Sequence, residues 1–119
     1  MAILGIDHVQ VAITPGGEEE ARRFYGALLG MPEAPKPEAL AGRGGVWFQC
    51  GGQQLHCGVE SPVAASRRHP ALLTDELDRL ADRLSEAACP IRHEPELPGF
   101  RRLFTEDPFG NRVELLQRV

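Results

Sequence analysis

The 119-residue sequence has few cysteines, no long apolar run and no excess of positive charge. Its three cysteines, Cys50, Cys57 and Cys89, are an odd number without CxxC spacing, which argues against a disulfide framework and a thiolate zinc site. No apolar run approaches the ~20 residues that a membrane-spanning helix needs. The formal net charge of −4, with arginines grouped only in pairs, argues against binding to a nucleic-acid backbone.

A secretory signal is also missing from the start of the chain. Residues 1–5 lack a basic n-region and a long apolar h-region, so we expect the mature chain to begin at Met1 and the protein to be cytoplasmic. The composition, 42% apolar and 25% charged, is that of an ordinary globular protein. A chain of this length suits one domain, which we place at residues 1–119.

The chain contains an internal repeat, whose first copy spans about residues 1–61. Its first strand is predicted from polar and apolar side chains that alternate over residues 7–13. After a Pro-Gly-Gly break, three glutamates open a segment with apolar residues at helical spacing, and Gly30 stands at the expected helix end. The rest of this copy is predicted to be a loop with a short strand at 32–45 and a hairpin of strands 46–50 and 53–59.

The second copy, about residues 67–119, repeats this order after a connector at 62–68. A short apolar run at 69–73 precedes a helix that Thr74 or Asp75 can cap and that ends before Pro90. Its apolar stripe is Leu77, Leu80, Ala81, Leu84 and Ala88. A second hairpin is predicted from strands 102–105 and 112–117. The repeated order of strand, helix and strands indicates an α+β fold.

Four potential metal ligands fall at matching positions of the two copies. His8 and His69 lie at the first strand of each copy, and His56 and Glu114 lie at the last, with separations of 48 and 45 residues. Each residue alone has an ordinary explanation, such as a strand histidine with one hydrogen bond. Their matching positions favour a shared role. Three imidazoles and a carboxylate suit Zn, Ni, Co, Mn or Fe better than Ca or Mg.

Three segments resemble signatures of the vicinal-oxygen-chelate superfamily, which includes glyoxalases, bleomycin-resistance proteins and extradiol dioxygenases. They are Ile6-Asp7-His8-Val9, Phe24-Tyr25 followed by Leu29-Gly30-Met31, and the run from Asp107 to Leu115. The resemblance implies two paired βαβββ modules in a half-open barrel, and usually a homodimer. Carried over by position, it assigns the four ligand places of glyoxalase-I-like members to His8, His56, His69 and Glu114.

The resemblance also implies a reaction. A divalent ion would act as a Lewis acid on a small carbonyl or thiohemiacetal substrate in a lyase or isomerase, and Glu114 would be the catalytic base. Residues that could line the substrate pocket are Trp47, Phe48, Arg102, Arg112 and Phe104, although core packing for the aromatic residues and a solvated strand position for the arginines are the simpler explanations. The absence of a basic cluster argues against glutathione as a required partner.

Two alternatives stay open. A bleomycin-resistance-type protein would sequester a small molecule without a reaction, and it would have no need of imidazoles at these positions. An Fe(II) extradiol dioxygenase would use three ligands, His8, His69 and Glu114, and would leave His56 unused. The fosfomycin-resistance branch uses the same three positions. Exposure of His56 to solvent would favour the dioxygenase.

Overall fold

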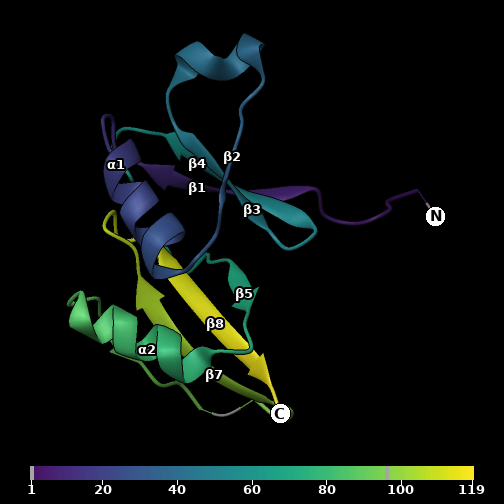
Figure 1. Cartoon of the computed structure of the whole chain (residues 1–119), viewed down its shortest axis with the longest axis vertical. Helices are drawn as coiled ribbons and strands as arrows, with labels where there is room; N and C mark the ends of the chain where they lie inside the picture. The colour runs from purple at the N-terminus through teal and green to yellow at the C-terminus, as the bar shows by residue number, and fades with distance from the viewer. Residues whose placement is uncertain (1, 96) are drawn as a thin grey trace. The chain divides into compact units, whose positions relative to one another are not determined.

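The computed structural model describes residues 2–95 and 97–119, and the chain divides into two compact units, Met1–Val63 and Ala64–Val119. Each unit contains a four-stranded mixed sheet, with strand orders β1-β4-β3-β2 and β5-β8-β7-β6 (Figure 1). The predicted α+β fold of two repeated βαβββ modules is confirmed. Among the described residues, no helix has the length and apolar character needed to cross a membrane.

The first unit follows the predicted order of elements. Its β1 pairs in parallel with β4, whereas β3 pairs antiparallel with both β4 and β2. The helical segment begins as an α-helix and continues as a π-helix, and Gly30 follows it with a φ of 81°. The elements are β1 (His8–Ile13), α1 (Glu18–Ala21), η1 (Arg22–Leu28), β2 (Glu33–Ala34), the 3-10 helix η2 (Glu38–Arg43), β3 (Val46–Cys50) and β4 (Gln53–Val59).

The core of the first unit lies between the helical segment and one face of its sheet. Phe24 and Tyr25 of η1 are at most 1% exposed, and the Tyr25 ring lies 5.9 Å from that of Phe48 on β3. Burial of each such ring contributes roughly 1.5–3 kcal/mol. Strand residues alternate between faces, so Leu55 joins this core while its neighbour His56 points to the other face of the sheet.

The second unit repeats the arrangement with a longer α-helix. In Figure 1, α2 lies along β7 and β8, and Leu77, Leu80 and Leu84 are its buried residues. The strand β5 pairs in parallel with β8, and the hairpin of β7 and β8 is antiparallel. The elements are β5 (Ala71–Leu73), α2 (Leu77–Glu86), β6 (Ile91–Arg92), β7 (Phe100–Glu106) and β8 (Arg112–Arg118).

The ends of α2 differ from the sequence expectation. Neither Thr74 nor Asp75 occupies the N-cap position, which belongs to Glu76. The side chain of Gln117 on β8 accepts a 2.9 Å hydrogen bond from the Leu77 N–H instead. At the other end, Ala88 lies beyond the helix with a φ of 59°, so it does not extend the apolar stripe. A side chain that is distant in sequence caps this helix.

Candidate functional site

The first unit carries two of the predicted ligands on the sheet face opposite its core. The ring of His56 on β4 lies between two other rings and is only 6% exposed. Trp47 on β3 stacks on one side, with ring centroids 3.7 Å apart and planes 2° from parallel. His8 on β1 also stacks on His56, at 4.0 Å and 18°. The two histidines and the tryptophan therefore form one aromatic stack.

Both histidines of this stack have one ring nitrogen held by an oxygen. Nδ1 of His8 lies 2.9 Å from the carboxylate of Asp7, and Nε2 of His56 lies 2.9 Å from the side-chain oxygen of Gln54. Burial chiefly lowers the pKa of His56, the neighbouring His8 lowers it further, and the carboxylate of Asp7 opposes both effects. The lowered pKa favours a neutral His56 ring, the form that binds metal ions.

The second unit brings the other two predicted ligands together. Glu114 on β8 is 6% exposed, and its Oε1 lies 2.9 Å from Nε2 of His69. Its Oε2 accepts a 3.1 Å hydrogen bond from Nη1 of Arg102 on β7. The ring of Phe104 meets that of His69 edge-on at 5.2 Å, and Arg102 and Arg112 lie over the Phe104 ring. A carboxylate, an imidazole and a guanidinium thus form a part-buried cluster.

The His69 ring shows whether these residues suit a metal ion. Its Nδ1 lies 2.9 Å from the backbone carbonyl of Arg67, which only accepts hydrogen bonds, so Nδ1 carries the proton. In a neutral ring, Nε2 then presents an electron pair to Glu114 Oε1, which also only accepts. Two facing acceptors need a second ring proton or a cation. A second ring proton would make this contact an ion pair between His69 and Glu114. A nitrogen and a carboxylate oxygen so placed also fit a divalent metal ion in place of that proton.

The strand registers show that the pair His8 and His56 in the first unit and the pair His69 and Glu114 in the second occupy equivalent positions in their sheets. In each unit the last strand carries one predicted ligand, and an aromatic residue is its antiparallel partner. A histidine lies two positions before the parallel partner of that ligand, within β1 in the first unit and just before β5 in the second. The equivalent residues are His56 and Glu114, Trp47 and Phe104, Gln10 and Ala71, and His8 and His69.

Not every predicted site residue joins these groups. Phe48 points to the core face of β3 and is 1% exposed, so its ring does not lie beside Trp47. Among residues 2–95 and 97–119, neither unit by itself gathers three or more His, Cys, Asp or Glu side chains that could hold one ion. The four predicted ligands lie as two pairs, one in each unit.

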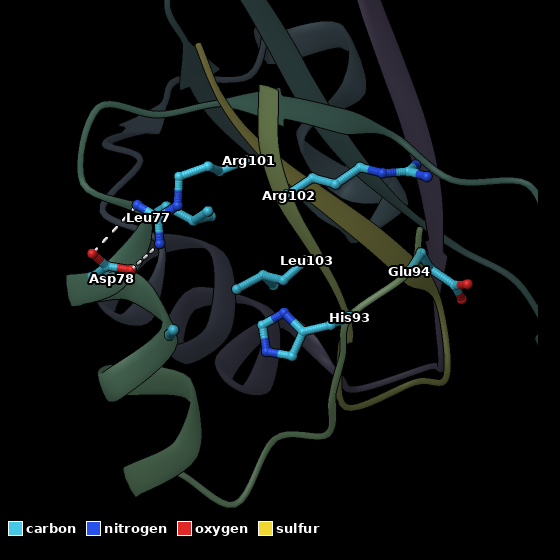
Figure 2. A pocket seen from close by; sticks show the side chains of 8 residues that line it. Leu77, Asp78, His93, Glu94, Arg101, Arg102 and Leu103 are labelled. Atoms are coloured by element: carbon cyan, nitrogen blue, oxygen red, sulfur yellow. Dashed lines mark hydrogen bonds and ion pairs between the residues drawn. The ribbon is translucent and has the colours of Figure 1, made fainter. Parts of the chain in front are cut away.

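A separate pocket of about 270 Å³ lies on the α2 side of the second unit. Figure 2 shows Leu77 and Asp78 of α2 on one side and His93 and Leu103 within it. The two neighbouring arginines on β7 point in opposite directions in this view. Arg101 reaches Asp78 at 2.6 Å, whereas Arg102 extends away from α2. Only Arg102 belongs both to this lining and to the Glu114 cluster.

The residues that orient the imidazoles were not predicted from the sequence. Asp7, Gln54 and the carbonyl of Arg67 each hold one ring nitrogen. Such partners are typical of metal-binding histidines. Two of these partners could have been predicted from their positions in the sequence. Asp7 directly precedes His8, and Gln54 lies two residues before His56 on the same strand face. A polar residue at those spacings can reach the ring.

Comparisons with known proteins identify the family of this chain. The family model described as Glyoxalase/Bleomycin resistance protein/Dioxygenase superfamily matches residues 5–115. A crystal structure of a protein from Bacillus anthracis, assigned to the glyoxalase family, is 46% identical, with a TM-score of 0.91, and the match covers 98% of this chain and 97% of that one. A search among curated proteins finds no match.

More distant structures share the fold. A glyoxalase/dioxygenase from Nostoc punctiforme is 22% identical, with a TM-score of 0.73 and coverage of 92% and 89%. The fosfomycin resistance protein FosX from Listeria monocytogenes is 15% identical in its hexagonal crystal form, with a TM-score of 0.79 and coverage of 98% and 95%. The repeated modules, the family match and the 46% identical relative lead to one conclusion: the chain belongs to the Glyoxalase/Bleomycin resistance protein/Dioxygenase superfamily.

Proposed function

We propose that this protein is a metal-dependent lyase or isomerase that acts on a small substrate with neighbouring oxygen atoms. In this proposal His8, His56, His69 and Glu114 hold one divalent ion such as Zn, Ni, Co, Mn or Fe. The protein would act in the cytoplasm as a homodimer. One observation carries the proposal: Nε2 of His69 and Oε1 of Glu114, two atoms suited to accept, face each other at 2.9 Å.

The hydrogen bonds of the three imidazoles support the same proposal. Each ring has one nitrogen on an oxygen acceptor, which orients the ring and directs an electron pair from the other nitrogen. A histidine that only packs in a core needs no oxygen acceptor at one ring nitrogen. All three predicted histidine ligands have such an acceptor, which favours a role in metal binding. Neutral imidazoles with a carboxylate are a donor set for borderline divalent ions.

The residues of this chain then have separate tasks. A bound divalent ion supplies Lewis-acid polarisation of neighbouring substrate oxygens. Arg102 holds Oε2 of Glu114, whereas Oε1 faces Nε2 of His69. Oε1 is therefore the oxygen that would hold the ion and, once released from it, would take a proton from a substrate carbon and return it. The Trp47 face and the Phe104 edge are the apolar groups beside the two ligand pairs and would contact the uncharged part of a substrate.

The burial of His56 bears on the alternatives. An Fe(II) extradiol dioxygenase with three ligands is favoured by a solvent-facing His56, whereas the ring is 6% exposed and enclosed by Trp47 and His8. A protein that only sequesters a small molecule has no physical need for three oriented imidazoles. We therefore favour the enzyme.

Metal analysis tests the proposal directly. Protein purified without a histidine tag is analysed by mass spectrometry and titrated calorimetrically with each of the five ions. We expect about one ion per chain and its loss in a His8→Ala, Glu114→Ala double variant. His93→Ala and Glu106→Gln together make a matched control, because both side chains are exposed and neither lies in a ligand pair.

The outcome decides which substrates are tried next. Metal binding that the double variant loses and the control keeps would be followed by a screen of thiohemiacetals, small ketones and fosfomycin. The last compound is included because FosX proteins share the fold. Protein that binds none of the five ions, or binds them equally well in the double variant, would overturn the proposal and favour a sequestering protein.

A further inference from the structure

A line of side-chain amides leads from the β3–β4 turn to His56. At its far end, Nε2 of Gln49 donates 2.9 Å hydrogen bonds to the backbone carbonyls of Gly51 and Gln53. Carbonyl oxygens only accept, so the nitrogen end of the Gln49 amide must point to them. The oxygen end of Gln49 therefore points the other way, along the sheet face.

This orientation passes to the next amide. Oε1 of Gln49 can only accept, and Nε2 of Gln54 donates to it at 3.3 Å. The oxygen of Gln54 is then left to face Nε2 of His56, at 2.9 Å. Since this oxygen also only accepts, the ring proton of a neutral His56 must be on Nε2. The direction of every hydrogen bond in the line follows from the two backbone carbonyls at its start.

The aromatic stack and the amide line constrain different motions of His56. Stacking between Trp47 and His8 holds the plane of the ring but permits a half-turn that exchanges its two edges. The Gln54 oxygen distinguishes those edges because it needs an N–H donor. Together they leave His56 with one plane, one orientation and one proton position.

We propose that Gln49 and Gln54 are positioning residues that hold neutral His56 with its proton on Nε2 and its free electron pair on Nδ1. His8 and His69 have the opposite arrangement, with the proton on Nδ1, because Asp7 and the Arg67 carbonyl accept there. The proton position does not depend on any metal. The further step, that His56 binds the ion through Nδ1, rests on the proposed function.

The β7–β8 hairpin of the second unit, which the structure describes in full, does not repeat this line of amides. In its hairpin, Glu106 and Arg112 stand at the register positions that Gln49 and Gln54 occupy in the first unit. A carboxylate and a guanidinium cannot form an amide line, and the ligand two residues beyond Arg112 is Glu114, which has no proton position to select. The pair of glutamines therefore belongs to the histidine of the first unit alone.

Long-range proton–nitrogen NMR on metal-free, nitrogen-15-labelled protein tests the proton position. It is recorded above the pH range in which His56 protonates. In the wild type we expect a protonated Nε2 and an unprotonated Nδ1 for His56. Gln54→Leu and Gln49→Leu should each convert this single form into a mixture. Gln54→Glu should keep the proton on Nε2, because its carboxylate still accepts the hydrogen bond.

Gln53→Leu is the matched control, since the Gln53 side chain is exposed and only its backbone carbonyl takes part in the line. It should leave the His56 spectrum unchanged. A proton on Nδ1 in the wild type, or a single unchanged form in both Gln54→Leu and Gln49→Leu, would overturn the inference. Circular dichroism of each variant shows whether it folds, and Gln54→Glu keeps the test decisive if the leucine variants unfold.

Titration with Zn²⁺ separates the inference from the proposed function. We expect the Nδ1 resonance of His56 to shift on binding, and Gln54→Leu to weaken Zn²⁺ affinity about 10–100-fold while Gln53→Leu does not. Absence of any Zn²⁺ binding would refute the proposed function and leave the proton position standing on its own spectrum. Zn²⁺ bound through Nε2 would overturn the Nδ1 step even though the protein binds metal.

Discussion

Replacement of Arg102 by methionine tests the charged cluster of the second unit. The Arg102 side chain is 20% exposed and donates to Glu114 at 3.1 Å and to the Pro95 carbonyl at 2.9 Å. Methionine keeps the apolar stem over the Phe104 ring but removes the charge and both hydrogen bonds. It leaves the buried carboxylate of Glu114 with His69 as its neighbour in the cluster.

The expected cost follows from these contacts. A hydrogen bond to a charged group contributes roughly 1.5–3 kcal/mol, so the metal-free protein should lose roughly 2–4 kcal/mol of unfolding free energy. Nε of Arg102 is buried without a hydrogen-bond partner among the described residues, and its removal offsets part of the loss. Urea denaturation measures the free energy, and the Tm should fall by on the order of 10 °C.

Arg101→Met provides the matched control for this experiment. Arg101 is the neighbouring residue on β7, points to the other side of the strand in Figure 2 and pairs with Asp78, whose side chain is 80% exposed. Water screens that pair, so its loss should change stability much less. Equal stability of the Arg102 and Arg101 variants would refute the reasoning, because the Glu114 cluster would then contribute nothing beyond a surface ion pair.

Three further predictions concern the first unit. Gly45→Ala should destabilise the protein by more than about 2 kcal/mol in urea denaturation, because an added Cβ would lie 2.3 Å from a β4 carbonyl oxygen at a φ of 85°. Gly30→Ala, with a similar φ of 81° and open space, should cost only about 1 kcal/mol, and equal costs would contradict the clash. Ni²⁺ should quench the fluorescence of Trp47, the single tryptophan, and His56→Leu should abolish the effect; quenching that persists would place the ion elsewhere. The Gly45 N–H chiefly lowers the pKa of Glu18, so its stabilising contribution is present at neutral pH and is lost as the pH falls through the lowered pKa. Glu18→Gln should therefore reduce the acid sensitivity of unfolding, and an unchanged pH profile would contradict this assignment.

Local patterns predicted most elements of the fold. The first hairpin was predicted at residues 46–50 and 53–59, and these are the bounds of β3 and β4. Alternation of side chains and a Gly-Gly turn are properties of neighbouring residues, so they can be recognised without a tertiary structure. The repeat was visible for the same reason, and it led to the four predicted ligands.

Elements that depend on distant partners were less predictable. The strand β6 at Ile91–Arg92 has only two residues and exists because β7 pairs with it, and no period can be recognised over so short a segment. The α2 cap was misassigned because the group that accepts from Leu77 belongs to Gln117, 40 residues further along the chain. Phe48 could not be assigned to a face until the helical segment was seen to cover it.

The sequence by itself determined the repeat, the order of elements and the residue types able to bind a metal, because these depend on spacing along the chain. Tertiary structure decided what each candidate touches: a Trp47–His56–His8 stack in one unit and a Glu114 cluster with His69 and Arg102 in the other. It also decided which nitrogen of each imidazole carries the proton. That choice depends on an acceptor placed by strand register and turn geometry, and the identity of a histidine alone contains no information about it.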